Sequence, residues 1–176
     1  MRLRPPTRRD QAEFLAAMRA SEEMHRPWNY PPTTADAFER MLARADSDRH
    51  ETMLVCRLDD GAIAGYFNIG EIIRGAFQSA FLGYGAVAAH TGRGYMTEGL
   101  ELLLAHAFGP LALHRLEANI QPANVRSIAL VRRCGFVHEG FATGYLKIGG
   151  RWRDHEHYAI RTEQWQARLA RPPSNR

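Results

Sequence analysis

The stretch from Phe81 to Glu98 has the residue types and spacing of an anion-binding site. An apolar strand runs into a glycine-punctuated turn, Thr91-Gly92-Arg93-Gly94, and the turn opens directly onto an amphipathic helix. Gly92 and Gly94 let the backbone approach a bulky ligand, because glycine has no side chain and tolerates positive φ. The first N–H groups of a helix have no intrahelical acceptors and attract an anion. This pattern predicts that main-chain amides hold a pyrophosphate.

Two other phosphate-binding loops are excluded by residue identity. The glycines are not followed by the Lys-Ser/Thr pair of a P-loop, and Thr97 stands where a dinucleotide fingerprint has its third glycine. Nucleotide hydrolysis is therefore not predicted. Because Gly-x-Gly alone is common in ordinary turns, the prediction rests on its strand-to-helix context and on the residues downstream.

Downstream, Glu117 lies on a predicted strand, Asn124 starts a predicted helix and Ser127 follows one turn later. Together with the glycine turn, these residues form a set of motifs: Gly83-Tyr84, Gly92-Arg93-Gly94-Tyr95-Met96-Thr97-Glu98, His114-Arg115-Leu116-Glu117-Ala118, Asn124-x-x-Ser127 and Gly135-Phe136. The chain thereby resembles the GNAT superfamily of N-acetyltransferases, and within it the RimJ/RimL-type ribosomal-protein N-terminal acetyltransferases. The similarity runs from Leu3-Arg4-Pro5 to Trp152-x-Asp154 and Tyr158.

The resemblance implies acetyl-CoA as cosubstrate. Its pyrophosphate would lie on the amides from about Thr91 to Thr97, and its pantetheine arm along a strand that splays from its neighbour. Position 89, often Gln or Arg in the family, is alanine here, which removes one phosphate contact and leaves the amides intact. Asn124 would bond the pantetheine amide, cap its helix, or do both. The implied cofactor-binding residues are Ala86, Val87, Thr91, Gly92, Arg93, Gly94, Tyr95, Met96, Thr97, Asn124 and Ser127.

Acetyl transfer to an amine needs a neutral nucleophile and a proton for the leaving thiolate. Many members of the superfamily supply that proton from a tyrosine, but the matching residue here is Val131, and the RimL-like pattern offers the Ser127 hydroxyl instead. The alternative is a serine bonded only to nearby backbone. By family position Glu117 is the expected base. Glu98 is the runner-up, although it could simply favour the helix dipole.

The acceptor side is expected at a proline-broken aromatic loop, residues 25–32, which either lines the site or closes the core. The subfamily resemblance suggests a protein N-terminal α-amino group as acceptor, and a small amine is the alternative. A non-catalytic acyl-CoA-binding regulatory module is a second hypothesis, which Val131 supports. The residues expected to border the acceptor are Trp28, Tyr30, Tyr84, Tyr145 and Trp152.

Periodicity and turn signals predict the elements that position these residues. An edge strand precedes a helix capped by Asp10, and Thr33 or Thr34 caps a second helix. The remaining predicted elements are strands at 51–58 and 62–69, a strand ending at Val87, a helix from Met96 to Phe108, a strand at 113–120, a helix starting at Asn124, a hairpin from Phe136 to Ile160 and a short helix from Thr162. The fold class is α/β (α+β). The resemblance implies a mixed, mostly antiparallel sheet of about seven strands, splayed in the middle and flanked by helices.

The length of 176 residues predicts one domain, residues 1–170, with a flexible tail at 171–176. The net charge of +4 favours solubility over nucleic-acid binding, because no basic face is evident. Neither a signal peptide nor a membrane-spanning run is seen, so a cytoplasmic protein without membrane or nucleic-acid partners is expected. We expect a monomer or a homodimer.

No metal site is predicted. Cys56 and Cys134 lack a metal-binding or disulfide spacing and are expected to be reduced and buried, and His155 and His157 share a strand face without a third ligand. The arginines at 126, 132 and 133 either meet the adenosine 3′-phosphate or form a solvated face.

Overall fold

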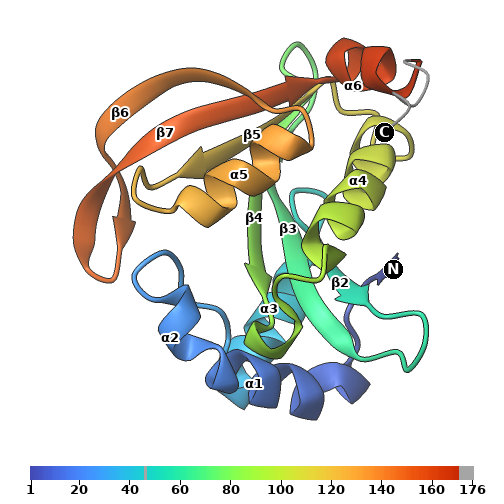
Figure 1. The fold of residues 1–176 in the computed structure, drawn as a ribbon, viewed down its shortest axis with the longest axis vertical. Helices are drawn as coiled ribbons and strands as arrows, with labels where there is room; N and C mark the ends of the chain where they lie inside the picture. Colours follow the sequence, from blue (N-terminus) through green and yellow to red (C-terminus); the bar gives the residue numbers. More distant parts are fainter. Residues whose placement is uncertain (46, 171–176) are drawn as a thin grey trace.

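The computed structural model describes residues 1–45 and 47–170, so the predicted tail at 171–176 lies outside the described residues. The strands are β1 (Arg2–Arg4), β2 (Glu51–Cys56), β3 (Ile63–Ile73), β4 (Ser79–Ala86), β5 (Arg115–Ile120), β6 (Val137–Ile148) and β7 (Arg151–Arg161). The helices are α1 (Gln11–Ala20), α2 (Glu22–His25), α3 (Ala35–Ala45), α4 (Tyr95–Phe108), α5 (Val125–Arg133) and α6 (Thr162–Leu169), with short 3₁₀ helices η1 (Arg8–Asp10) and η2 (Ala88–His90). Figure 1 shows their arrangement.

All seven strands form one sheet in the order β1-β2-β3-β4-β5-β7-β6. Every neighbouring pair is antiparallel except β4 and β5, which run parallel. Pairing between β4 and β5 extends only from Ser79 and Arg115 to Phe81 and Glu117. Both strands continue beyond this point, and Figure 1 shows them diverging. The prediction of a mixed, mostly antiparallel sheet splayed in the middle is confirmed.

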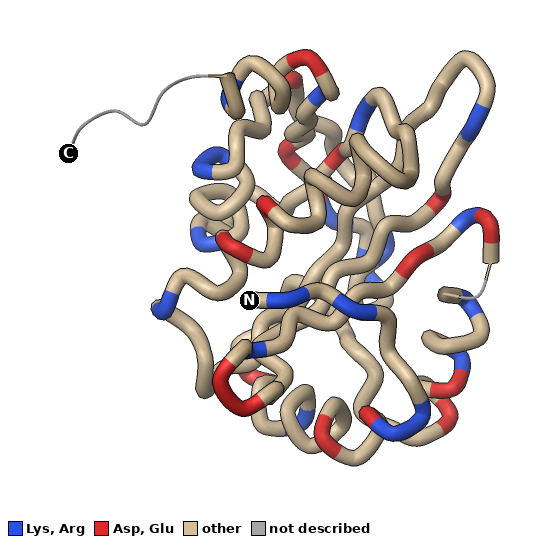
Figure 2. The backbone as a smooth tube through the Cα atoms, turned by 90° about the vertical axis from the view of Figure 1, so that its right-hand side faces the viewer, with Lys and Arg blue, Asp and Glu red and all other residues tan. Residues whose placement is uncertain are grey.

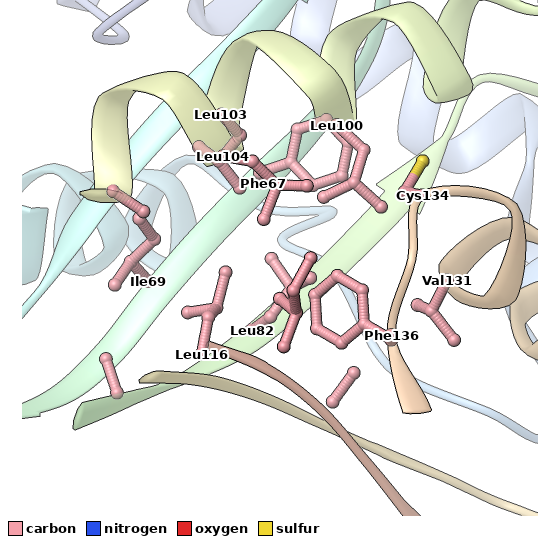
Figure 3. Close-up of a cluster of buried hydrophobic side chains, with 14 of the residues drawn as sticks. Phe67, Ile69, Leu82, Leu100, Leu103, Leu104, Leu116, Val131, Cys134 and Phe136 are labelled. Carbon is pink, nitrogen blue, oxygen red and sulfur yellow. The ribbon is translucent and has the colours of Figure 1, made fainter. Parts of the chain in front are cut away.

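Helix α4 covers one face of the sheet and forms the larger core with it. Its buried side chains Leu100, Leu103 and Leu104 pack in a cluster with Phe67 from β3 and Leu116 from β5 (Figure 3). The three leucines recur at helical spacing on α4, and the buried residues of β3, Phe67 and Ile69, alternate along the strand. One buried face of each element requires this spacing. The core therefore fixes α4, and with it the preceding glycine turn, against the sheet.

Helices α1 and α3 cover the opposite face of the first strands. Phe14 of α1 packs on Phe38 of α3 and on Tyr66 of β3, with ring centroids 5.3 and 5.6 Å apart respectively. All three side chains are buried. This second core also contains Val87, so it holds α1 and α3 beside the end of β4.

The sequence predicts capping residues for two helices, α1 and α3. Thr34 caps α3, because its hydroxyl accepts a hydrogen bond from the Ala37 N–H at 3.3 Å. Asp10 precedes α1 but makes no capping bond, so that prediction is wrong. Its carboxylate instead accepts hydrogen bonds from the Arg4 guanidinium at 2.8 Å and the Thr7 N–H at 2.7 Å. Asp10 thus pairs with Arg4 of β1 and forms a local capping box with Thr7 at the start of η1, one turn before α1.

Charged residues are dispersed over the molecule. Figure 2 shows Lys and Arg interspersed with Asp and Glu along the chain. Of the helices in the described ranges, none combines the length and apolar character needed to cross a membrane.

Hydrogen bonds from Arg4 and Thr7 lower the pKa of Asp10 from 3.8 to about 2. A depressed carboxyl pKa stabilises the folded state above the unfolded value, and this stability is lost as the pH falls from about 4 to about 2. Over this range we expect the unfolding free energy of wild type to fall by about 2 kcal/mol more than that of Asp10→Asn, which has no carboxylate at this position. Urea unfolding at pH 5.5 and 2.5 measures it, with exposed Asp36→Asn as control. An equal gap between wild type and Asp10→Asn at both pH values would contradict it.

Candidate functional site

The turn before α4 exposes a row of main-chain N–H groups. Gly92 and Gly94 have φ of 75° and 80°, the left-handed region that favours glycine. The N–H groups of Thr97 and Glu98 donate to the Gly94 carbonyl, each at 3.0 Å. Within the part of the chain that the structure describes, the N–H groups from Gly92 to Met96 donate to no protein acceptor. These free donors, at the positive end of a helix dipole, make an anion seat.

A cavity of about 1060 Å³ lies beside this seat. Its walls come from the segment around α2, the end of β4, the glycine turn and the first turns of α5. Its lining residues are Glu23, Met24, His25, Arg26, Trp28, Asn29, Tyr84, Gly85, Ala86, His90, Thr91, Gly92, Gly94, Tyr95, Met96, Thr97, Ala123, Asn124, Val125, Arg126, Ser127, Ala129, Leu130 and Arg133. Its volume suits a large small-molecule ligand.

The edge of β4 faces the gap between β4 and β5. The N–H of Val87, the residue just after β4, donates to the Ala64 carbonyl of β3 at 2.9 Å. Because backbone groups alternate in direction along an antiparallel strand, those of Tyr84 and Ala86 point away from β3, into the gap. Two side chains from the α2 region reach their carbonyls: His25 Nε2 lies 2.9 Å from the Ala86 oxygen, and Asn29 Nδ2 donates to the Tyr84 oxygen at 2.8 Å.

Asn124 and Ser127 lie at the start of α5 and line the cavity. The Asn124 side-chain oxygen accepts a hydrogen bond from the Ser127 N–H at 3.2 Å, so Asn124 is the N-cap of α5. Within the described residues the Ser127 hydroxyl makes no hydrogen bond to protein, and it is therefore free to interact with a ligand. Tyr84 also lines the cavity, and its hydroxyl donates to the Ser127 carbonyl at 3.3 Å. Burial raises the pKa of Tyr84, so this hydroxyl keeps its proton at neutral pH.

Neither proposed base lines the cavity. The Glu117 carboxylate accepts a hydrogen bond from the Arg115 Nε at 2.7 Å, and Arg115 also pairs with Glu139 on β6. Leu116 and Ala118, the neighbours of Glu117 on β5, are buried under the helices, so Glu117 points to the opposite face of the sheet. Glu98 pairs with the N-terminal ammonium of Met1.

The five aromatic residues predicted to border the acceptor lie in different places in the structure. Trp28 and Tyr84 line the cavity. Tyr30 lies against Gly149 at the β6–β7 turn, where an added Cβ would approach the Tyr30 hydroxyl to 2.5 Å. Tyr145 packs edge-on against His157 with ring centroids 4.6 Å apart, and Trp152 is 66% exposed on β7. The last three do not line the cavity.

Most of the predicted cofactor residues do line it. They are Ala86, Thr91, Gly92, Gly94, Tyr95, Met96, Thr97, Asn124 and Ser127. Val87 is instead buried in the second core, and the Arg93 side chain is exposed outside the cavity wall. Of the three arginines considered for a 3′-phosphate, Arg126 and Arg133 are lining residues, and Arg132 is not.

Sequence reasoning missed His25, Asn29 and Gln121, which bind backbone carbonyls in and around the gap. Their only sequence signal is a position on or next to predicted loops, and nothing local shows which strand each would reach. Burial lowers the pKa of His25, which favours its neutral form.

Both cysteines are free and buried. Burial raises the pKa of Cys134 to about 12, so it remains an unreactive thiol at neutral pH. In residues 1–45 and 47–170, no three His, Cys, Asp or Glu side chains are grouped so as to hold a metal ion.

A splayed mixed sheet with an amide-lined helix start at the splay defines an acetyltransferase-type α/β protein. The chain belongs to the GNAT family, since the family model described as an acetyltransferase (GNAT) domain matches residues 1–137.

Among similar proteins, the probable N-acetyltransferase YjcK of Bacillus subtilis is 39% identical over 117 residues, covering 66% of this chain and 65% of that protein. The ribosomal protein uS5-alanine N-acetyltransferase of Escherichia coli is 38% identical over 107 residues, covering 61% and 55%. The match thus spans less than two thirds of either relative. The structure of Mycobacterium smegmatis RimJ in complex with CoA-disulfide matches with a TM-score of 0.83 and 32% identity, covering 92% of this chain and 81% of that one.

A side chain at Gly94 would project into the anion seat. We expect CoA to raise the melting temperature of the wild-type protein, because a ligand that binds only the folded state stabilises it. Gly94→Glu should abolish this shift, since a carboxylate would stand where phosphate binds.

The matched control is Gly75→Glu. Gly75 also has a positive φ, of 69°, and an added Cβ there meets no atom within 4 Å, but it lies outside the cavity. Both variants thus carry the same charge and a similar backbone strain. Thermal unfolding with and without CoA separates them: a full CoA shift in Gly94→Glu would show that phosphate does not bind at the turn.

Proposed function

We propose that this protein is an acetyl-CoA-dependent N-acetyltransferase that transfers acetyl directly to a primary amine. The observation that carries the proposal is the row of unpaired N–H groups from Gly92 to Met96 on the wall of a cavity at the β4–β5 gap. Family membership supports the reaction class.

The residues present fit the cofactor. The amides from Gly92 to Met96 would hold the pyrophosphate, and the cationic side chains of Arg126 and Arg133 on the same wall suit a 3′-phosphate. The free edge of β4 at Ala86 offers backbone groups to the pantetheine amides. When bound, acetyl-CoA supplies the acetyl group as a reactive thioester.

In the proposed reaction the neutral amine attacks the acetyl carbonyl carbon. A C–N bond forms, the C–S bond breaks, and sulfur leaves as a thiolate that takes up a proton. The Ser127 hydroxyl is proposed to donate that proton and to regain one from water, because it lines the cavity and, within the described residues, makes no hydrogen bond to protein. Tyr84 holds the backbone of Ser127 through its hydrogen bond. Because Glu117 lies outside the cavity, it can accept the proton of the amine only through water.

For the acceptor we propose a protein N-terminal α-amino group. The name of the Escherichia coli relative, which describes an alanine of a ribosomal protein, supports this choice. Release of free CoA from acetyl-CoA tests the function, with a peptide panel bearing free N-termini and a panel of small amines including spermidine. Release of CoA with small amines alone would contradict the peptide acceptor and favour a small amine. Tight CoA binding without release for any amine would favour a non-catalytic module.

Ser127→Ala should slow turnover by about 10- to 1,000-fold with little change in CoA affinity, because only the proton transfer to sulfur is lost. The lower end applies if water also protonates sulfur. Ser127→Thr retains the hydroxyl and should keep most of the rate. Steady-state kinetics and CoA titration measure both effects. Equal rates for Ser127→Ala and wild type would leave Ser127 without a role as acid.

A further inference from the structure

The segment from His25 to Asn29 bridges the gap between β4 and β5 and is hydrogen-bonded to both sides of it. On the β4 side, His25 and Asn29 reach the carbonyls of Ala86 and Tyr84. On the β5 side, Gln121 follows directly after the last residue of β5 and donates from its Nε2 to two carbonyls of the segment. The segment is thus tied across the site from opposite strands.

Gln121 is a buried polar side chain, 9% exposed. Its Nε2 lies 3.2 Å from the Pro27 oxygen and 3.3 Å from the Trp28 oxygen. Buried polar groups need such partners, because an unpaired one loses its hydration without compensation. Gln121 does not line the cavity, whereas Trp28 and Asn29 do. Its influence on a ligand would therefore pass through the bridging segment.

The bridging segment borders two cavities. The second cavity, of about 90 Å³, lies against it, and His25, Arg26 and Asn29 line both. Less of the segment can therefore be held by packing, and hydrogen bonds matter more to its position. In the described residues, the bonds from the β5 side come from Gln121.

We propose that Gln121 is a positioning residue that sets the distance between the Trp28 wall and β5, and through it the affinity for the amine acceptor. This inference rests on the proposed function. Gln121 acts on the β5 side, whereas the bonds from His25 and Asn29 to β4 remain when it is changed. Within the described residues, the hydrogen bonds of the Gln121 side chain go to Pro27 and Trp28 and none goes to the anion seat from Gly92 to Met96. Loss of Gln121 should therefore weaken acceptor binding and leave CoA binding intact.

Two variants remove the donor. Gln121→Leu leaves the Pro27 and Trp28 carbonyls unpaired, and Gln121→Glu keeps the size but places a carboxylate against two carbonyl oxygens. The matched control is Gln78→Glu, because the Gln78 amide also lies on a backbone carbonyl, that of Ala112, outside the cavity. We expect an acceptor KM about 10-fold higher in both Gln121 variants, with kcat and the KM for acetyl-CoA within about 2-fold of wild type.

Hydrogen exchange of the free protein provides a readout that needs no acceptor. Amides of residues 25–33 should exchange faster in both Gln121 variants than in wild type and Gln78→Glu, while those of 92–97 should not change. Unchanged exchange at 25–33, an unchanged acceptor KM, or an equal loss of acceptor and CoA affinity would each overturn the proposal. If wild type acetylates no amine in either panel, the proposed function fails, and the exchange result still decides whether Gln121 holds the segment.

Discussion

The pairing between β4 and β5 ends early, although both strands continue. Three residue pairs join the strands, and beyond Phe81 and Glu117 each strand has an unpaired edge in the middle of the sheet. Backbone groups there cannot stay unsatisfied away from water. Side chains from the α2 region satisfy part of β4, and the rest faces a cavity. The gap therefore creates the binding site and also the need for a segment that closes one side of it.

The two ends of the cavity offer different chemical groups to a ligand. At the turn before α4, the proposed anion seat consists of backbone amides rather than a cationic cluster, which is compatible with a net charge of only +4 and dispersed charges. At the other end the wall consists of one loop held by neutral hydrogen bonds. The glycine turn leads into α4, which the core fixes, whereas the loop borders two cavities. The proposed anion seat is therefore held by packing, and the proposed acceptor wall depends more on hydrogen bonds.

Features carried by local sequence were predictable, and those set by tertiary contact were not. The glycines at 92 and 94, and the helical spacing of Leu100, Leu103 and Leu104, report directly on backbone geometry and burial, so the turn, the helix and the fold class were predicted correctly. The direction of Glu117 depends on the register of β5, and its pairing with Arg115 is not a local signal. Asp10 looked like a cap because its partner Arg4 lies on another element. Gln121 lies next to a predicted loop, and nothing in its local sequence shows which carbonyls its side chain would reach.

A short chain segment connects the two functional sides of the gap. The Gln121 carbonyl accepts a hydrogen bond from the Asn124 N–H at 2.9 Å, and the Asn124 side chain in turn caps the Ser127 N–H. The side chain of Gln121 donates to the Pro27 carbonyl, while Ser127 lines the cavity from α5. The proposed positioning residue and the proposed proton donor are thus held by one turn after β5. Because hydrogen bonds fix both ends of this turn, a shift of β5 relative to β4 would move the wall and the hydroxyl together and preserve the spacing between them.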